Sequence, residues 1–405
     1  MSMNMGMGLA AIFMVACAPS RSVHPGFRNT QGTQVDAGAS GNPTPSVAGD
    51  LRFQLIYVIH GDAGYTYYDE TGERRFADRE AVAQAEEVAR NSPAAEVFIF
   101  HQKPSTFLWF LRGADGMMRH YRGGKLLRTT AYQKETREDD LESEAALFHR
   151  HAAFPAPEAC PAKSVAHPKG GPARFFLYFG HEIPVTEEVS YSRSHPDMAF
   201  SMSSFARGLA KFGGPGCSHA KPFSLIVLSA CHGGTPTATS ALTPYTSYLL
   251  ASPGDLHLSY LDTRSLARAA RESPVPFETA HAGVWARAIA LESFERLRET
   301  TSTAITLSLY DTDAASAFLD SRREAWQAQT APAGMRVMTS APKQYRDLRP
   351  TAPPLYRDCA ENPAFGLGGE EAGVTVYYHA PRFGLDKSKL FHSGWECPAA
   401  PPQGL

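Results

Sequence analysis

Six apolar runs of strand length, separated by segments with helical periodicity, place the strongest constraint on what this 405-residue chain can fold into. Most of these runs are apolar on successive residues, which is typical of strands buried on both faces. The runs cover residues 51–59, 95–100, 174–179, 224–230, 248–252 and 303–310. The helix-like segments between them are 78–92, 200–213 and 281–300. Strands that alternate with helices predict an α/β protein with a mostly parallel six-stranded sheet, covered by helices on both sides.

Residues 106–132 interrupt this alternation. They carry Gly-Ala-Asp-Gly and Arg-Gly-Gly turns between aromatic-rich runs, which predicts an inserted antiparallel hairpin at the edge of the sheet. Residues 133–172 are polar and then rich in Pro, Ala and His, so we expect a long surface loop there. We assign residues 51–330 to a single domain. The Pro- and Gly-rich residues 331–405 form a C-terminal extension, in which only 373–380 has the pattern of a strand.

The first seventeen residues form an apolar segment that is too short to span a bilayer and that ends in small residues and Cys17. This segment resembles a bacterial lipoprotein signal peptide, and the resemblance implies that Cys17 becomes an acylated N-terminus. Residues 18–50 contain almost no large apolar residue and are expected to form a flexible linker. Together these features predict a domain that is lipid-anchored to the bacterial cell envelope outside the cytoplasm. Ordinary secretion and a cytosolic chain stay open as alternatives.

Charge and cysteine count narrow the class of protein further. Thirty-nine Lys and Arg against 41 Asp and Glu give a formal charge of -2, and no basic block is long enough to follow a phosphate backbone, which argues against nucleic-acid binding. No CxxC or HExxH spacing indicates a zinc site. Of six cysteines, one is assigned to the lipid and one to chemistry, so four can form two disulfides with three connectivities. Proximity in the sequence favours Cys160 with Cys217 and Cys359 with Cys397.

Reactive side chains follow four of the predicted strands. In open parallel sheets, ligands bind beyond the carboxyl ends of the strands, where loops and helix N-termini converge. A thiol near an imidazole at such an edge can be held as thiolate and attack an acyl carbon. For the thiol of Cys231, the small residues Gly233, Gly234 and Thr235 that follow soon after it let the backbone turn away at once. They predict that the Cys231 side chain lies at the rim of the sheet. A buried and inert core cysteine is the alternative. The four residues are His60, His101, His181 and Cys231.

Two of these strands carry a family resemblance. An apolar block ending in His and, about fifty residues later, an apolar block ending in Ala-Cys resemble the caspase-like cysteine peptidases. Residues 174–184 and 224–234 fill these positions, and the order of elements over about residues 50–325 is most similar to the clostripain (C11-type) family. The resemblance implies a caspase-like three-layer α/β/α sandwich and a cysteine endopeptidase. It also implies that Cys231 is the nucleophile, that His181 is its base and acid, and that backbone N–H groups at Cys231 and after His181 form the oxyanion hole.

The chain departs from the clostripain pattern at two positions. The family usually has Gly after the histidine, where this chain has Glu182, and often Asp two residues before the cysteine, where it has Ser229. Cleavage after Arg or Lys would then need another carboxylate, and Asp255, on the loop after the next strand, is available. We therefore consider Ser229, Asp255 and Glu182 as candidate substrate-binding residues. A solvated loop carboxylate is the alternative for Asp255.

Two other functions stay open. The departures at Glu182 and Ser229 are consistent with a catalytically inactive caspase-like binding module on the cell surface. An α/β-hydrolase with Cys231 as nucleophile and His379 or His392 as base fits less well, because its nucleophile elbow needs a Gly where this chain has Ser229.

We expect no cofactor and no resident metal. Some relatives in the clostripain family use calcium, for which Asp62, Asp69 and Asp311 are unspecific candidate oxygen ligands. The expected partners are a peptide or protein substrate and, through the lipid on Cys17, the membrane. We expect the protein to be a monomer.

Overall fold

The computed structural model describes several separate segments of the chain. The described residues are 51–62, 65–68, 72–104, 115–134, 140–154, 172–184, 200–213, 221–254, 256, 261–272, 281–300, 305–317, 319–320 and 373–379.

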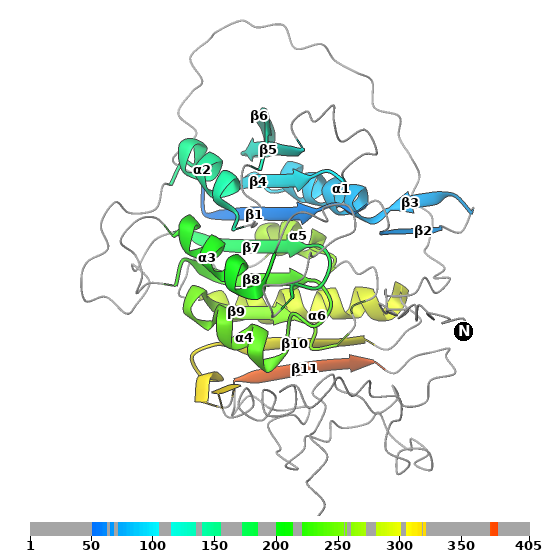
Figure 1. Cartoon of the computed structure of the whole chain (residues 1–405), viewed down its shortest axis with the longest axis vertical. Helices are drawn as coiled ribbons and strands as arrows, with labels where there is room; N and C mark the ends of the chain where they lie inside the picture. The colour runs from blue at the N-terminus through cyan, green and yellow to red at the C-terminus, as the bar shows by residue number, and fades with distance from the viewer. Residues whose placement is uncertain are drawn as a thin grey trace, which may run out of the picture.

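A nine-stranded sheet forms the centre of this fold (Figure 1). Its strands are β1 (Phe53–His60), β4 (Ala95–Gln102), β5 (Gly116–Arg122), β6 (Lys125–Tyr132), β7 (Ala173–Phe179), β8 (Phe223–Ser229), β9 (Thr246–Ala251), β10 (Ile305–Asp311) and β11 (Val374–His379). The order across the sheet is β11-β10-β9-β8-β7-β1-β4-β5-β6. The five central strands are parallel, and antiparallel pairs extend the sheet at both edges. A separate pair, β2 (Thr66–Tyr68) and β3 (Arg74–Phe76), is antiparallel.

All six apolar runs form strands of this sheet, as predicted. The hairpin is confirmed as β5 and β6 at one edge, although residues 106–114 of its predicted range lie outside the described residues. The predicted count of six strands is too low. The hairpin pairs with β4 and β11 pairs with β10, which are the two outer strands of the six. Backbone hydrogen bonding therefore continues across all nine strands.

Helices cover both faces of the sheet, which confirms the predicted three layers (Figure 1). One face carries α1 (Ala77–Arg90), α5 (Arg264–Glu272) and α6 (Ala282–Thr300), and the other carries α2 (Glu142–His151), α3 (Met202–Phe212) and α4 (Pro236–Leu242). Successive strand residues alternate between the two cores: Leu55 and Tyr57 enter one, Ile56 and Val58 the other. This double burial is the reason that the strands are apolar on successive residues.

The sequence predicted a long surface loop over residues 133–172, but part of this stretch forms a helix. α2 forms within it and buries Ala145, Leu147 and Phe148 against the sheet. The Phe148 ring lies 5.1 Å from that of Phe98, centroid to centroid, on β4. α2 is only ten residues long, and its short apolar stretch is flanked by Glu142 and Glu144 on one side and by Arg150 on the other, so the polar flanks dominate the sequence pattern.

The C-terminal extension contributes directly to this core. β11 pairs antiparallel with β10, and its Val374 and Val376 side chains are buried. The Tyr377 ring lies 5.6 Å from that of Phe294 on α6. A segment from beyond residue 330 is therefore part of the same sheet as residues 51–320.

Candidate active site

Cys231 lies two residues beyond Ser229, the last residue of β8, and is only 6% exposed. The backbone turns sharply at this point. His232 has a φ of 54°, in the left-handed region, and the Gly234 N–H donates to the Ser252 carbonyl at 2.8 Å. A Cβ on Gly234 would lie 2.9 Å from backbone atoms of Ser252 and Pro253, so only glycine allows this close approach.

The thiol of Cys231 contacts the loop that follows β9. The Leu256 N–H donates to Sγ at 3.4 Å, and the thiol donates to the Leu256 carbonyl at 3.7 Å. The backbone N–H and C=O of one residue, Leu256, both contact this thiol. The thiol therefore has a fixed and buried position just beyond the end of β8.

His181 follows β7 and makes a specific contact with a carboxylate. Its Nε2 lies 2.8 Å from Oδ2 of Asp62, and the two side chains are 36% and 6% exposed. The ring of Tyr65 lies 4.6 Å from the imidazole, centroid to centroid, at 34°. Sequence reasoning considered Asp62 only as a calcium ligand. Asp62 lies two residues after His60, which ends the first strand, and this position at a strand end is the signal that could have identified it as a site residue.

Strand register brings His181 and Cys231 to the same edge of the sheet. β7 and β8 are parallel neighbours in which Phe179 pairs with Ser229. The Gly180 N–H continues the pairing by donating to the Ser229 carbonyl at 3.3 Å. His181 and Cys231 each lie two residues beyond the last pair, so they leave the sheet from adjacent strands.

The other candidate histidines lie on strands farther from β8. His60 ends β1, two strands away, and His101 lies near the end of β4, three strands away. His379 ends β11, also three strands from β8, on the opposite side. At about 4.8 Å between strands, these separations are about 10 to 14 Å, against one strand spacing for His181. His392 lies outside the described residues.

His60 and His101 are also engaged in buried contacts of their own. His60 Nε2 lies 3.3 Å from Nζ of Lys134, which in turn lies 3.1 Å from Glu144. His101 Nε2 lies 2.8 Å from Oδ2 of Asp78. These contacts are consistent with structural roles for both histidines.

The candidate substrate-binding residues differ in what the structure records. Ser229 is buried, and its Oγ accepts a hydrogen bond from the Leu261 N–H at 3.1 Å. Glu182 is exposed and is not among the described residues with positive φ, so this turn does not require the glycine that the family usually has there. Asp255 lies outside the described residues.

Several other sequence predictions fall outside the described residues: Cys17, the four cysteines of the predicted disulfides, and Asp69. Asp311 accepts a hydrogen bond from the Ala314 N–H at 3.1 Å, and Asp62 contacts His181. Within the described residues, no group of three or more His, Cys, Asp or Glu side chains has the arrangement of a metal site.

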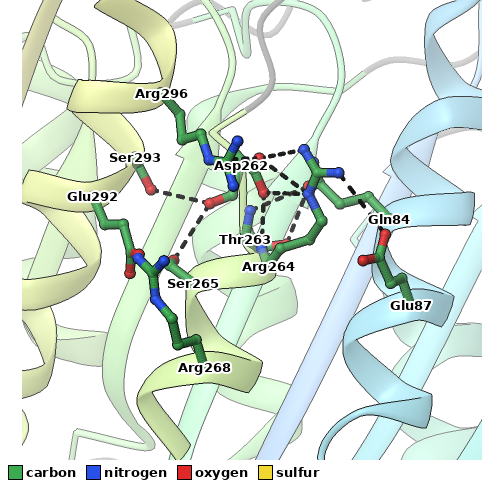
Figure 2. Close-up of polar contacts among 10 residues, drawn as sticks. All are labelled: Gln84, Glu87, Asp262, Thr263, Arg264, Ser265, Arg268, Glu292, Ser293 and Arg296. Carbon is green, nitrogen blue, oxygen red and sulfur yellow. Dashed lines mark hydrogen bonds and ion pairs between the residues drawn. The ribbon is translucent and has the colours of Figure 1, made fainter. Parts of the chain in front are cut away.

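A cavity of about 210 Å³ lies among α1, α5 and α6, and neither Cys231 nor His181 lines it (Figure 2). Three of its lining arginines, Arg264, Arg268 and Arg296, pair with carboxylates, and Arg271 donates to the Asn91 carbonyl at 3.1 Å. Arg264 Nε donates to Oδ1 of Asp262 at 2.9 Å, and Arg268 pairs with Glu292.

The same network fixes the segment that precedes α5. Hydroxyls of Ser265 and Ser293 donate to the Asp262 carbonyl, and Gln84 accepts from the Thr263 N–H at 3.2 Å (Figure 2). This segment continues from Leu261, which contacts Ser229. The cavity is therefore best explained as part of a structural network that holds the loop beside the candidate site.

Solved structures with a similar arrangement include two of a secreted C11 cysteine protease from Bacteroides thetaiotaomicron, one in complex with an irreversible peptide inhibitor and one called iotapain, and one of an inactive zymogen C11 protease from Parabacteroides distasonis. The solved structures that this chain resembles are C11 cysteine proteases. Sequence identities are 13%, 12% and 14%, and TM-scores are 0.44, 0.43 and 0.42. In the same order, the matches cover 68%, 69% and 68% of this chain and 70%, 70% and 65% of the matched chains. No protein-family model and no curated protein matches the chain.

No helix within the described residues combines the length and the apolar character needed to cross a bilayer.

Proposed function

We propose that this protein is a cysteine endopeptidase that hydrolyses peptide bonds, with Cys231 as nucleophile and His181 as its base and acid. One observation carries the proposal: a thiol and an imidazole leave adjacent parallel strands at the same edge of the sheet, and the imidazole contacts a buried carboxylate. Ligands bind at this edge in open parallel sheets. A cysteine and a histidine so arranged are suited to acyl transfer.

The chemistry needs two proton transfers. His181 accepts the proton of the Cys231 thiol, and the thiolate attacks the carbonyl carbon of the scissile bond. When the C–N bond breaks, the same proton passes from the imidazolium to the leaving amine. Water then attacks the thioester with His181 as base, which releases the acid product and restores the thiol.

The negative charge that develops on the carbonyl oxygen needs hydrogen-bond donors. We propose the backbone N–H groups of Cys231 and Glu182 for this role, because both follow directly from the strand ends that carry the reacting groups. A backbone donor does not depend on the identity of the side chain, so the glutamate at position 182 is compatible with it.

The alternative is a caspase-like binding module without turnover. Its support is the close contact of the thiol with the Leu256 backbone and its low exposure, together with the departures at Ser229 and Glu182. Labelling with iodoacetamide or an acyloxymethyl ketone separates the two functions. A peptidase should be labelled at Cys231, and labelling should depend on His181.

The first prediction tests the catalytic pair. Cys231→Ser and His181→Ala should each lower kcat on peptide substrates by about 10²-fold or more, since general acid–base and nucleophilic catalysis are both lost. Circular dichroism and thermal unfolding should show that both variants are folded. His60→Ala serves as the comparison and should have a milder effect. Equal loss of activity in a folded His60→Ala variant would show that His181 is the wrong base.

We further propose that the domain is held at the bacterial cell envelope by acylation of Cys17. The support is the resemblance of residues 1–17 to a lipoprotein signal and the polar linker that follows. The protein should partition into detergent with the membrane fraction, and Cys17→Ser should release it or leave the precursor uncleaved. A wild-type protein found wholly in the cytosol would contradict this proposal.

A further inference from the structure

The carboxylate beside His181 belongs to Asp62, two residues after the end of β1. Gly61 continues the sheet, because its N–H donates to the Gln102 carbonyl at 2.8 Å. A Cβ at this glycine would lie 2.7 Å from Cδ of Pro104 and 2.8 Å from Gln102 O, so the chain passes very close to the end of β4. Asp62 follows directly. Its position is thus determined by the sheet rather than by a free loop.

The turn that starts at Asp62 supplies a second group to the histidine. The Tyr65 N–H donates to the Asp62 carbonyl at 3.0 Å, which closes the turn. The Tyr65 ring is buried and also lies 6.2 Å from the ring of Phe179, the last residue of β7. The imidazole of His181 is therefore oriented by a carboxylate at one nitrogen and by an aromatic ring close to its face.

This arrangement determines which nitrogen of His181 can act as a base. A carboxylate accepts hydrogen bonds, so Nε2 must carry the proton in the 2.8 Å contact with Asp62. In the neutral imidazole, the lone pair is then on Nδ1. When Nδ1 takes up a proton, the positive charge lies next to the Asp62 carboxylate and close to the Tyr65 ring, and both stabilise it.

We propose that Asp62 is a positioning residue for His181 and that Tyr65 assists it, so that two further side chains support the pair of Cys231 and His181. This inference rests on the proposed function. In the reaction, the proton moves from Sγ of Cys231 to Nδ1 of His181 and later from Nδ1 to the leaving amine. Asp62 keeps its negative charge throughout and donates no proton.

The chain offers a matched control for this role. Asp78 and His101 form an equivalent pair, with the same 2.8 Å separation between Oδ2 and Nε2. His101 lies on β4, three strands from β8, whereas Asp78 lies on α1 near Gly61, where an added Cβ would be 2.8 Å from its Oδ2. Asp78→Asn removes the same charge from the same kind of contact. Any effect that is merely structural should appear in both variants.

The test compares Asp62→Asn, Asp62→Glu, Tyr65→Leu and Asp78→Asn in the full chain, after thermal unfolding has shown that each variant folds. Asp62→Asn should lower kcat by about 10²-fold and change KM by less than about threefold, because positioning acts on the chemical step. Asp62→Glu should recover part of the rate. Tyr65→Leu should lower kcat by about 10-fold, and Asp78→Asn should leave kcat unchanged.

Alkylation of Cys231 by iodoacetamide provides a readout that does not require turnover. Loss of the carboxylate makes the thiolate–imidazolium pair less stable, so in Asp62→Asn the acidic limb of the rate profile should move to higher pH. Asp78→Asn should follow the wild-type profile. If wild-type protein cleaves no peptide, the proposed function fails, while the alkylation profiles still test the coupling of Asp62 to Cys231.

Three outcomes would overturn the inference. The first is a folded Asp62→Asn variant with wild-type kcat and alkylation profile. The second is an equal loss in Asp78→Asn, which would indicate a general effect of removing a buried charge. The third is a calcium response of the wild type, measured with CaCl2 and EDTA, that Asp62→Asn abolishes without changing the alkylation profile, which would make Asp62 a metal ligand instead.

Discussion

At the scale of single residues, the surroundings of a side chain decide what it can do. Asp62 with His181 and Asp78 with His101 have the same carboxylate–imidazole geometry. In the second pair, both side chains are almost fully buried, at 2% and 10% exposure. In the first, the imidazole is 36% exposed and lies on the strand next to that of Cys231. Of the two imidazoles, that of His181 is thus the more exposed.

Specificity is the prediction that belongs to this scale. Ser229 is uncharged and its Oγ accepts from the Leu261 N–H, so it cannot balance a cationic substrate side chain. If Asp255 supplies the carboxylate, substrates with Arg or Lys before the scissile bond should be cleaved best. Asp255→Ala should then cost about 2 to 5 kcal/mol in kcat/KM for them, with little effect on neutral substrates.

A panel of fluorogenic peptides measures this preference, and Asp313→Ala, which removes a carboxylate that is 78% exposed, is the matched control. A wild-type preference for a neutral or acidic residue would exclude the clostripain-like specificity. An unchanged Arg preference in Asp255→Ala would exclude Asp255 as its cause.

At the scale of elements, β11 shows that a short strand in a Pro- and Gly-rich segment can be part of the core. Its side chains alternate between buried Val374 and Val376 and partly buried neighbours, and it covers the open side of β10 within the described residues. Pairing with β10 satisfies backbone groups along the whole of the strand. The stability of the domain should therefore depend on it.

Truncation tests this dependence. A chain that ends after residue 372 lacks β11, and a chain that ends after residue 380 keeps it. The shorter chain should be less stable by at least about 3 kcal/mol, since the burial of two valines contributes about 1.5 kcal/mol or more for each. Urea unfolding of the two chains measures the difference. Equal midpoints would show that β11 adds nothing to the stability of the sheet.

At the scale of the whole molecule, the two ends of the parallel strands have different roles. The reactive side chains lie at the carboxyl ends, whereas the amino ends hold a row of polar residues in register, namely the partly buried Arg174 and the buried Gln54 and Glu96. Arg174 Nε donates to Gln54 Oε1 at 3.0 Å, and Gln54 Nε2 donates to Glu96 Oε2 at 2.8 Å. This row ties β7, β1 and β4 together across the centre of the sheet.

Glu96 makes this row sensitive to acid. Burial alone would raise the pKa of its carboxyl, but hydrogen bonds from His120, Gln54, Arg122 and the Ala153 N–H outweigh burial and lower the pKa below its ordinary value of 4.5. A lowered pKa in the folded state means that the ionised carboxylate stabilises the fold above about pH 4.5. This contribution is lost as the pH falls through the lower pKa of the folded protein.

Glu96→Gln should therefore cost about 3 to 5 kcal/mol at neutral pH, because Arg122 and His120 lose a buried partner. Its stability should also fall less steeply than that of the wild type when the pH is lowered from 6 to 3. Urea unfolding across this range measures both effects, with Glu73→Gln, whose side chain is 68% exposed, as the control. Parallel pH dependences for Glu96→Gln and wild type would contradict the assignment.

The sequence by itself determined the layers of the fold and the positions of the reactive residues along the chain. Burial on both faces makes a strand apolar on successive residues, and the end of such a run marks the edge of the sheet, so both features are local in the sequence. For this reason the six central strands, the hairpin, and four strand ends with His or Cys could be predicted. Short elements such as α2, whose apolar face spans few residues, could not.

Only the tertiary structure decided which strand ends lie together. Strand order depends on packing between distant segments: β7 lies between β1 and β8, so His181 is beside Cys231, whereas His101 is three strands away. The contact between Asp62 and His181 joins residues 119 positions apart. No periodicity encodes such a contact, because it exists only when the sheet places the ends of β1 and β7 side by side.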